Sequence, residues 1–162
     1  MKTVHVEDVF RGDEARFWTN FFDPHINEQI YCTELGFPRY RVLDLTNTPE
    51  MAWRDAEITA RLDLPRAAKS IIGDTFRYRE QGTLRRDTGR YEFRLIPEGA
   101  IASRFDSRRT VFLRSYQGHL VRIAEVTIAV RIPLFAGVLE EIVANLVESG
   151  LRRSAVVVDR LV

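Results

Sequence analysis

The chain has 162 residues, of which 45% are hydrophobic and 29% are charged. This composition excludes an intrinsically disordered chain, and the length allows a core that needs no disulfide or metal to fold. The formal net charge of +1 hides an uneven distribution, because residues 75–131 hold 12 basic against six acidic residues and acidic residues outnumber basic ones on either side.

A single cysteine, Cys32, excludes an intramolecular disulfide framework and a cysteine-rich metal site, and it fits a protein of the reducing cytoplasm. Glu7 and Asp8 interrupt any apolar signal core near the start of the chain, and charged residues also interrupt its longest apolar stretch. No repeat or linker-like tract divides the sequence. We therefore expect one cytoplasmic domain over residues 1–162, without an integral membrane segment.

The first part of the chain predicts one strand followed by two short helices. Apolar residues alternate along residues 2–10, which is typical of a strand. Asp13 is suited to cap a helix that runs to Phe22. Asp23 is followed by proline and is suited to cap a second helix, which we expect to end near Leu35.

The middle of the chain, from Pro38 to Ile132, predicts six consecutive strands, because its hydrophobic residues recur with a period of about two. Turn-forming residues separate them. Short connections make such strands antiparallel, and the alternation gives the sheet one apolar face. The strands are expected near residues 39–45, 53–64, 75–84, 90–95, 101–115 and 119–131.

Beyond Pro133, apolar residues recur at helical spacing, which predicts an amphipathic helix from Leu134 to Leu161. Gly150 lies inside it and indicates a bend or a close contact, since glycine lowers helix stability by about 1 kcal/mol. The fold class is therefore α+β, in the order β-α-α-β6-α. The long helix is expected to cover the apolar face of a curved antiparallel sheet.

This order resembles the helix-grip fold of the START-like (SRPBCC) superfamily, which includes pollen-allergen-type ligand binders, polyketide aromatase/cyclases and lipid-transfer proteins. The resemblance extends over essentially the whole chain, and three segments carry it. The first two are VEDVFRGDEARFWTNFFD at the start and RYEFRLIPEG in the sheet. The third, AEVTIAVRIPLFAGVLEEIVANL, joins the last strand to the final helix and is similar to the same junction in a bacterial subgroup of these proteins.

The resemblance implies a ligand cavity between the curved sheet and the long helix. Its walls would be the inward-facing residues of the strands and the facing side of the helix, and aromatic or aliphatic walls suit a bulky apolar ligand. Ordinary core packing is the alternative at each of these positions. The ligand-binding candidates are Tyr40, Phe76, Tyr78, Tyr91, Phe93, Phe105, Val126, Ile142 and Leu146.

The sequence predicts no metal, cofactor or catalytic residue. No pair of histidines has metal-ligand spacing, and no nucleophile or phosphate-binding motif occurs. Asp55 and Glu57 share one strand face, which we expect to be the solvated outer face. Because the sheet aromatics are expected to face inward, a basic surface for nucleic acid is not expected. The outer face would also hold Arg77, Arg79, Arg90 and Arg94.

We therefore expect the protein to bind or transport a hydrophobic small molecule or lipid, without catalysis. One alternative is a polyketide aromatase/cyclase-like enzyme, for which Tyr78, Tyr91 or His25 would have to supply the polar group in the cavity. The other alternative is an interaction module whose cavity is small or filled. A pocket well below several hundred Å³ would favour this last interpretation.

Overall fold

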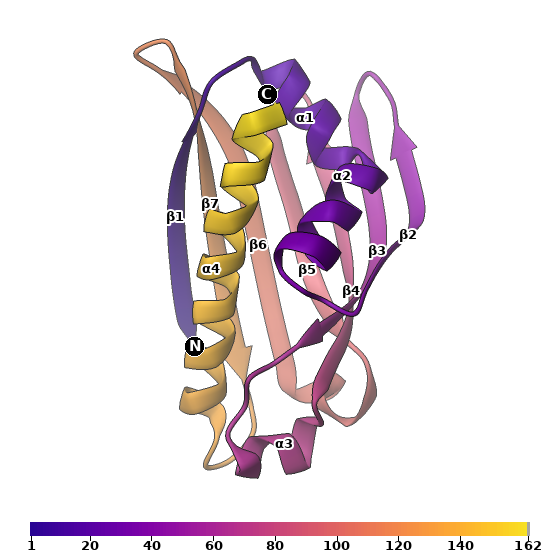
Figure 1. Cartoon of the computed structure of the whole chain (residues 1–162), viewed down its shortest axis with the longest axis vertical. Helices are drawn as coiled ribbons and strands as arrows, with labels where there is room; N and C mark the ends of the chain where they lie inside the picture. The colour runs from indigo at the N-terminus through magenta and orange to yellow at the C-terminus, as the bar shows by residue number, and fades with distance from the viewer. Residues whose placement is uncertain (162) are drawn as a thin grey trace.

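The computed structural model of the chain describes residues 1–161, except for the side chains of Ile71 and Leu161. Its seven strands form one antiparallel sheet in the order β1-β7-β6-β5-β4-β3-β2. Figure 1 shows the long helix α4 running along one face of this sheet, with α1 and α2 beside it over the same face. No helix of the described part of the chain is long and apolar enough to cross a membrane.

The strands are β1 (Lys2–Phe10), β2 (Arg39–Asn47), β3 (Met51–Arg61), β4 (Thr75–Arg85), β5 (Arg90–Pro97), β6 (Phe105–Tyr116) and β7 (His119–Val130). The α-helices are α1 (Glu14–Phe22), α2 (Pro24–Glu28), α3 (Arg66–Ile72) and α4 (Ala136–Leu161). Two further helical turns are the π-helical η1 (Gln29–Glu34) and the 3-10 helix η2 (Gly99–Arg104).

The predicted α+β helix-grip order is confirmed, and so are the two helix caps near the start of the chain. The Asp13 carboxylate accepts a hydrogen bond of 2.8 Å from the backbone N–H of Arg16. The Asp23 carboxylate accepts bonds from the first turn of α2, at 2.8 Å from His25 and 3.0 Å from Ile26. These bonds satisfy amide donors that have no partner within the helix.

The start of the long helix differs from the prediction. We expected helix from Leu134, but α4 begins at Ala136. Leu134 instead has a left-handed backbone, with φ of 69°, and its side chain is 97% exposed. The turn after Pro133 reverses the chain from β7 into α4, and this reversal carries Leu134 away from the core.

Residues 99–104 also differ from the prediction, because the 3-10 helix η2 occupies the expected start of a strand.

Two hydrophobic clusters form the core. One packs the first half of α4, including Leu139 and Val143, against the inner face of the sheet. The other packs the aromatic side of α1, including Phe17, against the end of α4 near Val157 and Val158. The helical segment α1–η1 and the second half of α4 therefore enclose the region where the two clusters meet.

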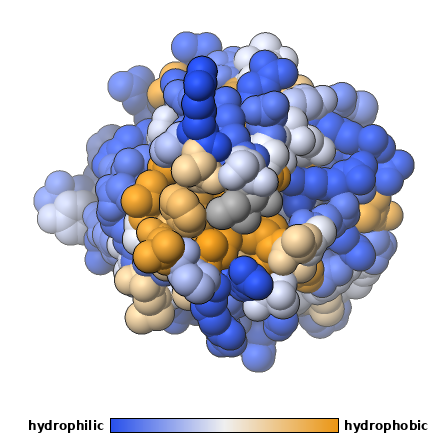
Figure 2. All heavy atoms as spheres, turned by 90° about the horizontal axis from the view of Figure 1, so that it is seen from below, coloured by the Kyte–Doolittle hydropathy of each residue, from blue (hydrophilic) through white to orange (hydrophobic). Residues whose placement is uncertain are grey.

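One end of the molecule presents apolar side chains to solvent. Figure 2 views the end that carries α3, η2 and the β7–α4 connection, and apolar atoms gather in the middle of this view. The β7–α4 connection supplies the exposed Leu134, and Val138 in the first turn of α4 is 47% exposed. This apolar end lies away from the helical segment α1–η1 (Figure 1).

Gly82 of β4 allows two aromatic rings of β5 to lie directly over its strand. A Cβ atom at residue 82 would lie 2.4 Å from the Phe93 Cβ and 2.5 Å from the Tyr91 hydroxyl. No ordinary side chain fits at such distances, so the site requires glycine. We predict that Gly82→Ala lowers the free energy of unfolding by about 1–3 kcal/mol, as measured by urea denaturation.

The matched control is Gly137→Ala in the first turn of α4, where a Cβ atom would meet nothing within 4 Å. This variant should be as stable as the wild type or slightly more stable, because alanine favours a helix. If Gly82→Ala is as stable as the wild type, the packing of the Tyr91 and Phe93 rings does not require glycine at residue 82.

Candidate functional site

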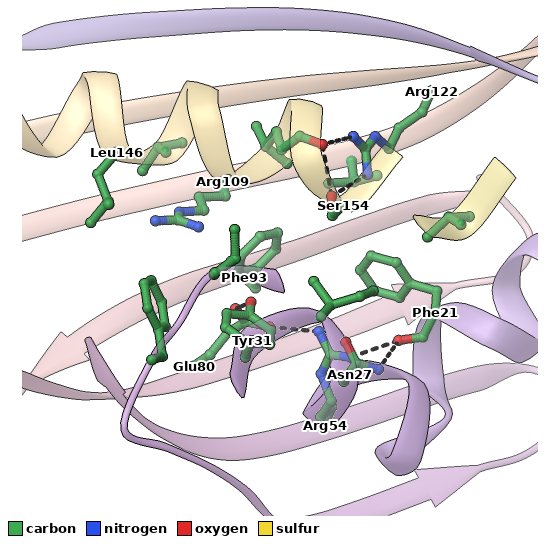
Figure 3. Close-up of a pocket in the computed structure, with 18 of the residues that line it drawn as sticks. Phe21, Asn27, Tyr31, Arg54, Glu80, Phe93, Arg109, Arg122, Leu146 and Ser154 are labelled. Carbon is green, nitrogen blue, oxygen red and sulfur yellow. Dashed lines mark hydrogen bonds and ion pairs between the residues drawn. The ribbon is translucent and has the colours of Figure 1, made fainter. Parts of the chain in front are cut away.

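A cavity of about 120 Å³ lies between the second half of α4, the segment α1–η1 and the inner face of the sheet (Figure 3). The helix α4 supplies apolar and small residues from Leu146 to Val158. The opposite wall comes from α1 to Phe37, and the sheet supplies the floor. Gly150 faces this region, because a Cβ atom there would lie 3.7 Å from Leu35. A Cβ atom would fit there in ordinary van der Waals contact, so the close contact expected at Gly150 does not require a glycine.

Three of the nine predicted ligand-binding residues line this cavity, namely Tyr78, Phe93 and Leu146. Figure 3 shows Phe93 and Leu146 on opposite sides of it, from β5 and α4. Their contact with a ligand remains a prediction. The other six lie outside the lining and pack in the core or against it: Tyr40, Phe76, Tyr91, Phe105, Val126 and Ile142.

The six residues outside the lining are covered by neighbouring side chains. The rings of Phe76 and Phe105 contact each other with 5.6 Å between centroids, under the first half of α4. The ring of Tyr91 is fully buried and packs edge-on against Phe21 and Phe22 of α1, at 5.1 and 5.4 Å. A side chain on the inner face of the sheet therefore packs in the core, but it does not always line the cavity.

A buried ion pair between Arg54 and Glu80 forms the polar part of the cavity wall. Arg54 of β3 and Glu80 of β4 are each only 2% exposed, and Arg54 Nη2 donates to Glu80 Oε1 at 2.6 Å. Arg54 Nη1 donates to the backbone oxygen of Phe21 at 2.7 Å, at the end of α1. The Asn27 amide of α2 donates to the same oxygen at 2.8 Å. The pair therefore fixes the α1–α2 junction to the sheet.

Aromatic side chains surround this pair. The Arg54 guanidinium lies 4.9 Å from the ring centroid of Phe21 and 5.7 Å from that of Tyr91, within the range of cation–π attraction. The Tyr31 hydroxyl donates to Glu80 Oε2 at 3.4 Å, and its ring stacks on Tyr40 at 4.8 Å. These rings exclude water from the charges, which strengthens the attraction within the pair.

The phenols near the pair are hydrogen-bond donors at neutral pH. Burial raises the pKa of Tyr31 well above its usual value, and the negative charge of Glu80 acts in the same direction. Burial also raises the pKa of Tyr40 to about 12. Burial likewise raises the pKa of Tyr78, although the charge of Arg109 partly opposes it. None of these groups is set up to act as a base.

A second buried ion pair fixes the other side of the cavity. Arg122 of β7 pairs with Asp8 of β1, and it also donates to the backbone oxygen of Leu151 at 2.8 Å and to the Ser154 hydroxyl at 3.3 Å. Burial lowers the pKa of Arg122, and the charge of Asp8 opposes that effect. This group connects the β1–β7 edge to the second half of α4.

Of the three residues that the sequence predicted for an enzyme, Tyr78, Tyr91 and His25, only Tyr78 lines the cavity. His25 is exposed at the start of α2, and Tyr91 lies beneath α1 outside the lining. Within the described part of the chain, no group of three or more histidine, cysteine, aspartate or glutamate residues could hold a metal ion.

Sequence reasoning missed four charged residues of the site: Arg54, Glu80, Arg109 and Arg122. The signal was available, because each shares the inward direction of apolar residues two positions away on its strand. Arg54 precedes Ala56 by two residues, and Glu80 follows Tyr78 by two. A charge at such a position must be paired or must serve a ligand.

The outer face of the sheet also needs a correction. We expected Asp55 and Glu57 to be solvated, but they are only 5% and 9% exposed. Arg79 pairs with Asp55, and Arg39 Nε lies 3.2 Å from Glu57 Oε1. The long arginine side chains cover the shorter acidic ones, since their apolar stems lie flat on the sheet.

Sequence and fold place the protein among known proteins. The profile of the family described as "Protein of unknown function (DUF2505)" matches residues 10–162. No curated protein has a matching sequence. A solved structure from Thermus thermophilus has a similar fold, with a TM-score of 0.69 and 16% identity over 99% of this chain and 96% of that one.

Two other structures carry descriptive names. A START superfamily protein from Mycobacterium smegmatis has a TM-score of 0.65 and 9% identity, covering 99% of both chains. The Zhui aromatase/cyclase from Streptomyces sp. R1128 has a TM-score of 0.64 and 10% identity, over 98% of this chain and 92% of that one. At such identities the likeness shows the fold, and it confirms the START-like architecture expected from the sequence.

The Arg54–Glu80 pair leads to a stability prediction. Arg54→Met leaves the Glu80 carboxylate buried without its partner, so the free energy of unfolding should fall by about 3–5 kcal/mol in urea denaturation. The double variant Arg54→Met/Glu80→Met removes both charges and should be more stable than Arg54→Met alone. A double variant less stable than the single variant would contradict this role for the pair.

Proposed function

Because the chain belongs to the DUF2505 family and has the START-like fold, we propose that it binds a hydrophobic small molecule in the cavity between the sheet and α4. The observation that carries the proposal is the cavity itself, whose floor and walls include Tyr78, Phe93 and Leu146. An aromatic and aliphatic lining with a few polar groups is typical of small-molecule sites.

The size of the cavity limits the ligand. Its volume of about 120 Å³ is below the several hundred Å³ that drug-sized ligands occupy. An apolar cavity of roughly 150 Å³ can bind benzene. The ligand we propose is therefore a single ring or a short alkyl chain.

An interaction module is the second candidate, and two observations favour it. The cavity is small, and the apolar end of the molecule exposes Leu134 and Val138. In that function the cavity would be a packing defect and the exposed apolar side chains would contact another protein. Binding of a small neutral molecule to the cavity distinguishes the two candidates.

We predict that the wild-type protein binds 1-octanol, a neutral probe with a short alkyl chain, as measured by saturation-transfer NMR. Leu146→Trp should abolish this binding, because the larger ring fills the space next to Phe93 (Figure 3). Val156→Trp is the matched control, because Val156 lies on the same helix, is 54% exposed and does not line the cavity.

Both tryptophan variants should keep the wild-type circular dichroism spectrum. Val156→Trp should also bind 1-octanol as the wild type does. If 1-octanol receives no saturation from the wild type, the protein does not have the proposed function and the interaction module is favoured. Equal saturation transfer from the wild type and Leu146→Trp would show that the probe binds elsewhere.

A further inference from the structure

We propose that the ligand carries a carboxylate group and that Arg109 binds this carboxylate inside the cavity. The inference rests on the proposed function, since it names the chemical class of the ligand for the same site. Three arginines line the cavity, Arg54, Arg109 and Arg122, and within the described part of the chain only Arg109 lacks an acidic partner.

Arg109 lies on the inner face of β6, with Ser107 and Val111 two residues away on the same face. Its partners across the sheet are Phe93 of β5 and Val126 of β7. The residues next to it on this face are therefore apolar except for one serine. The Tyr78 phenol also lies within electrostatic reach of the guanidinium, but no carboxylate of the described strands forms an ion pair with it.

The guanidinium of Arg109 reaches into the cavity instead of leaving it. It lies over the ring of Phe93, 5.5 Å from the centroid. Figure 3 shows its end between Leu146 of α4 and Phe93, away from the Arg54–Glu80 pair. The side chain is half-buried and is part of the cavity lining.

The charge of Arg109 is uncompensated, in contrast to the other two arginines. Arg54 pairs with Glu80 at 2.6 Å and Arg122 pairs with Asp8. Among the residues that the structure describes, Arg109 forms no ion pair, and its buried Nε has no hydrogen-bond partner. A half-buried cation without a partner is unfavourable, and an anionic ligand would remove that penalty.

The net charge of the cavity indicates which head group the ligand carries. Glu80 and Asp8 neutralise two of the arginines, so one positive charge remains and matches a monoanion. A guanidinium presents parallel N–H donors that fit the two oxygens of a carboxylate. Phe93 and Leu146, which lie on either side of the guanidinium, would contact the apolar part of the ligand. The assigned class is thus a small amphipathic monocarboxylic acid.

The test compares octanoate with 1-octanol at pH 7, because the two probes share a chain of eight carbons and differ in charge. Dissociation constants come from NMR titration of the wild type and two variants. The wild type should bind octanoate about tenfold or more tightly than 1-octanol, as expected of one charge-assisted contact. Arg109→Gln should weaken octanoate to the level of 1-octanol and leave 1-octanol unchanged.

Arg108→Gln is the matched control. Arg108 is the next residue on β6 but points outward, where its side chain is 84% exposed near Asp106. This variant should keep the wild-type preference for octanoate. Equal binding of octanoate and 1-octanol by the wild type would overturn the carboxylate assignment while leaving the proposed function intact. A preference for octanoate that survives Arg109→Gln would also overturn the carboxylate assignment. Tighter binding of octyl phosphate than of octanoate would show that the preferred head group is not a carboxylate.

Discussion

The buried ion pair between Arg54 and Glu80 is the interaction on which the site depends. An isolated helical segment as short as α1–η1 would gain little stability from its own hydrogen bonds, so it needs attachment to the sheet. Arg54 provides this attachment by donating to Glu80 at 2.6 Å and to the backbone oxygen of Phe21 at 2.7 Å. The stacked aromatic rings around it keep water away. The segment held in this way forms one wall of the cavity.

The cavity lies where the two hydrophobic clusters meet, since Leu35 and Leu151 pack against both clusters and also line it. The first half of α4 packs directly on the sheet, while its second half packs on α1. Arg122 connects β7 to the backbone oxygen of Leu151, and this contact fixes the second half of α4. Two buried ion pairs, one on each side, therefore attach the walls of the cavity to the sheet, and a third arginine, Arg109, faces the space between them.

The fold was largely predictable because its determinants are local. Alternating apolar residues predicted the six consecutive strands, and the Asp13 and Asp23 caps predicted where the first two helices begin. The start of α4 was wrong by two residues, because the backbone reversal at Leu134 is not encoded in helical spacing.

The site was only partly predictable. Phe76 and Phe93 both have the inward direction, yet only Phe93 lines the cavity, since the distance between α4 and the sheet decides where space remains. The charged residues were missed for a different reason. Aromatic residues on the inner face indicate a lining, but they do not indicate that charged residues share the same face. A buried position occupied by a charge is a stronger indication of a site than one occupied by an aromatic ring, because the charge requires a partner.

A crystal structure of the protein with octanoate would test the central claim most directly. We predict that the alkyl chain packs against the apolar lining of the cavity, and that a carboxylate oxygen lies about 3 Å from the Arg109 guanidinium, as in a charge-assisted hydrogen bond. An empty cavity at saturating octanoate, or octanoate bound only on the outer surface, would contradict the assignment of a carboxylate ligand to this cavity.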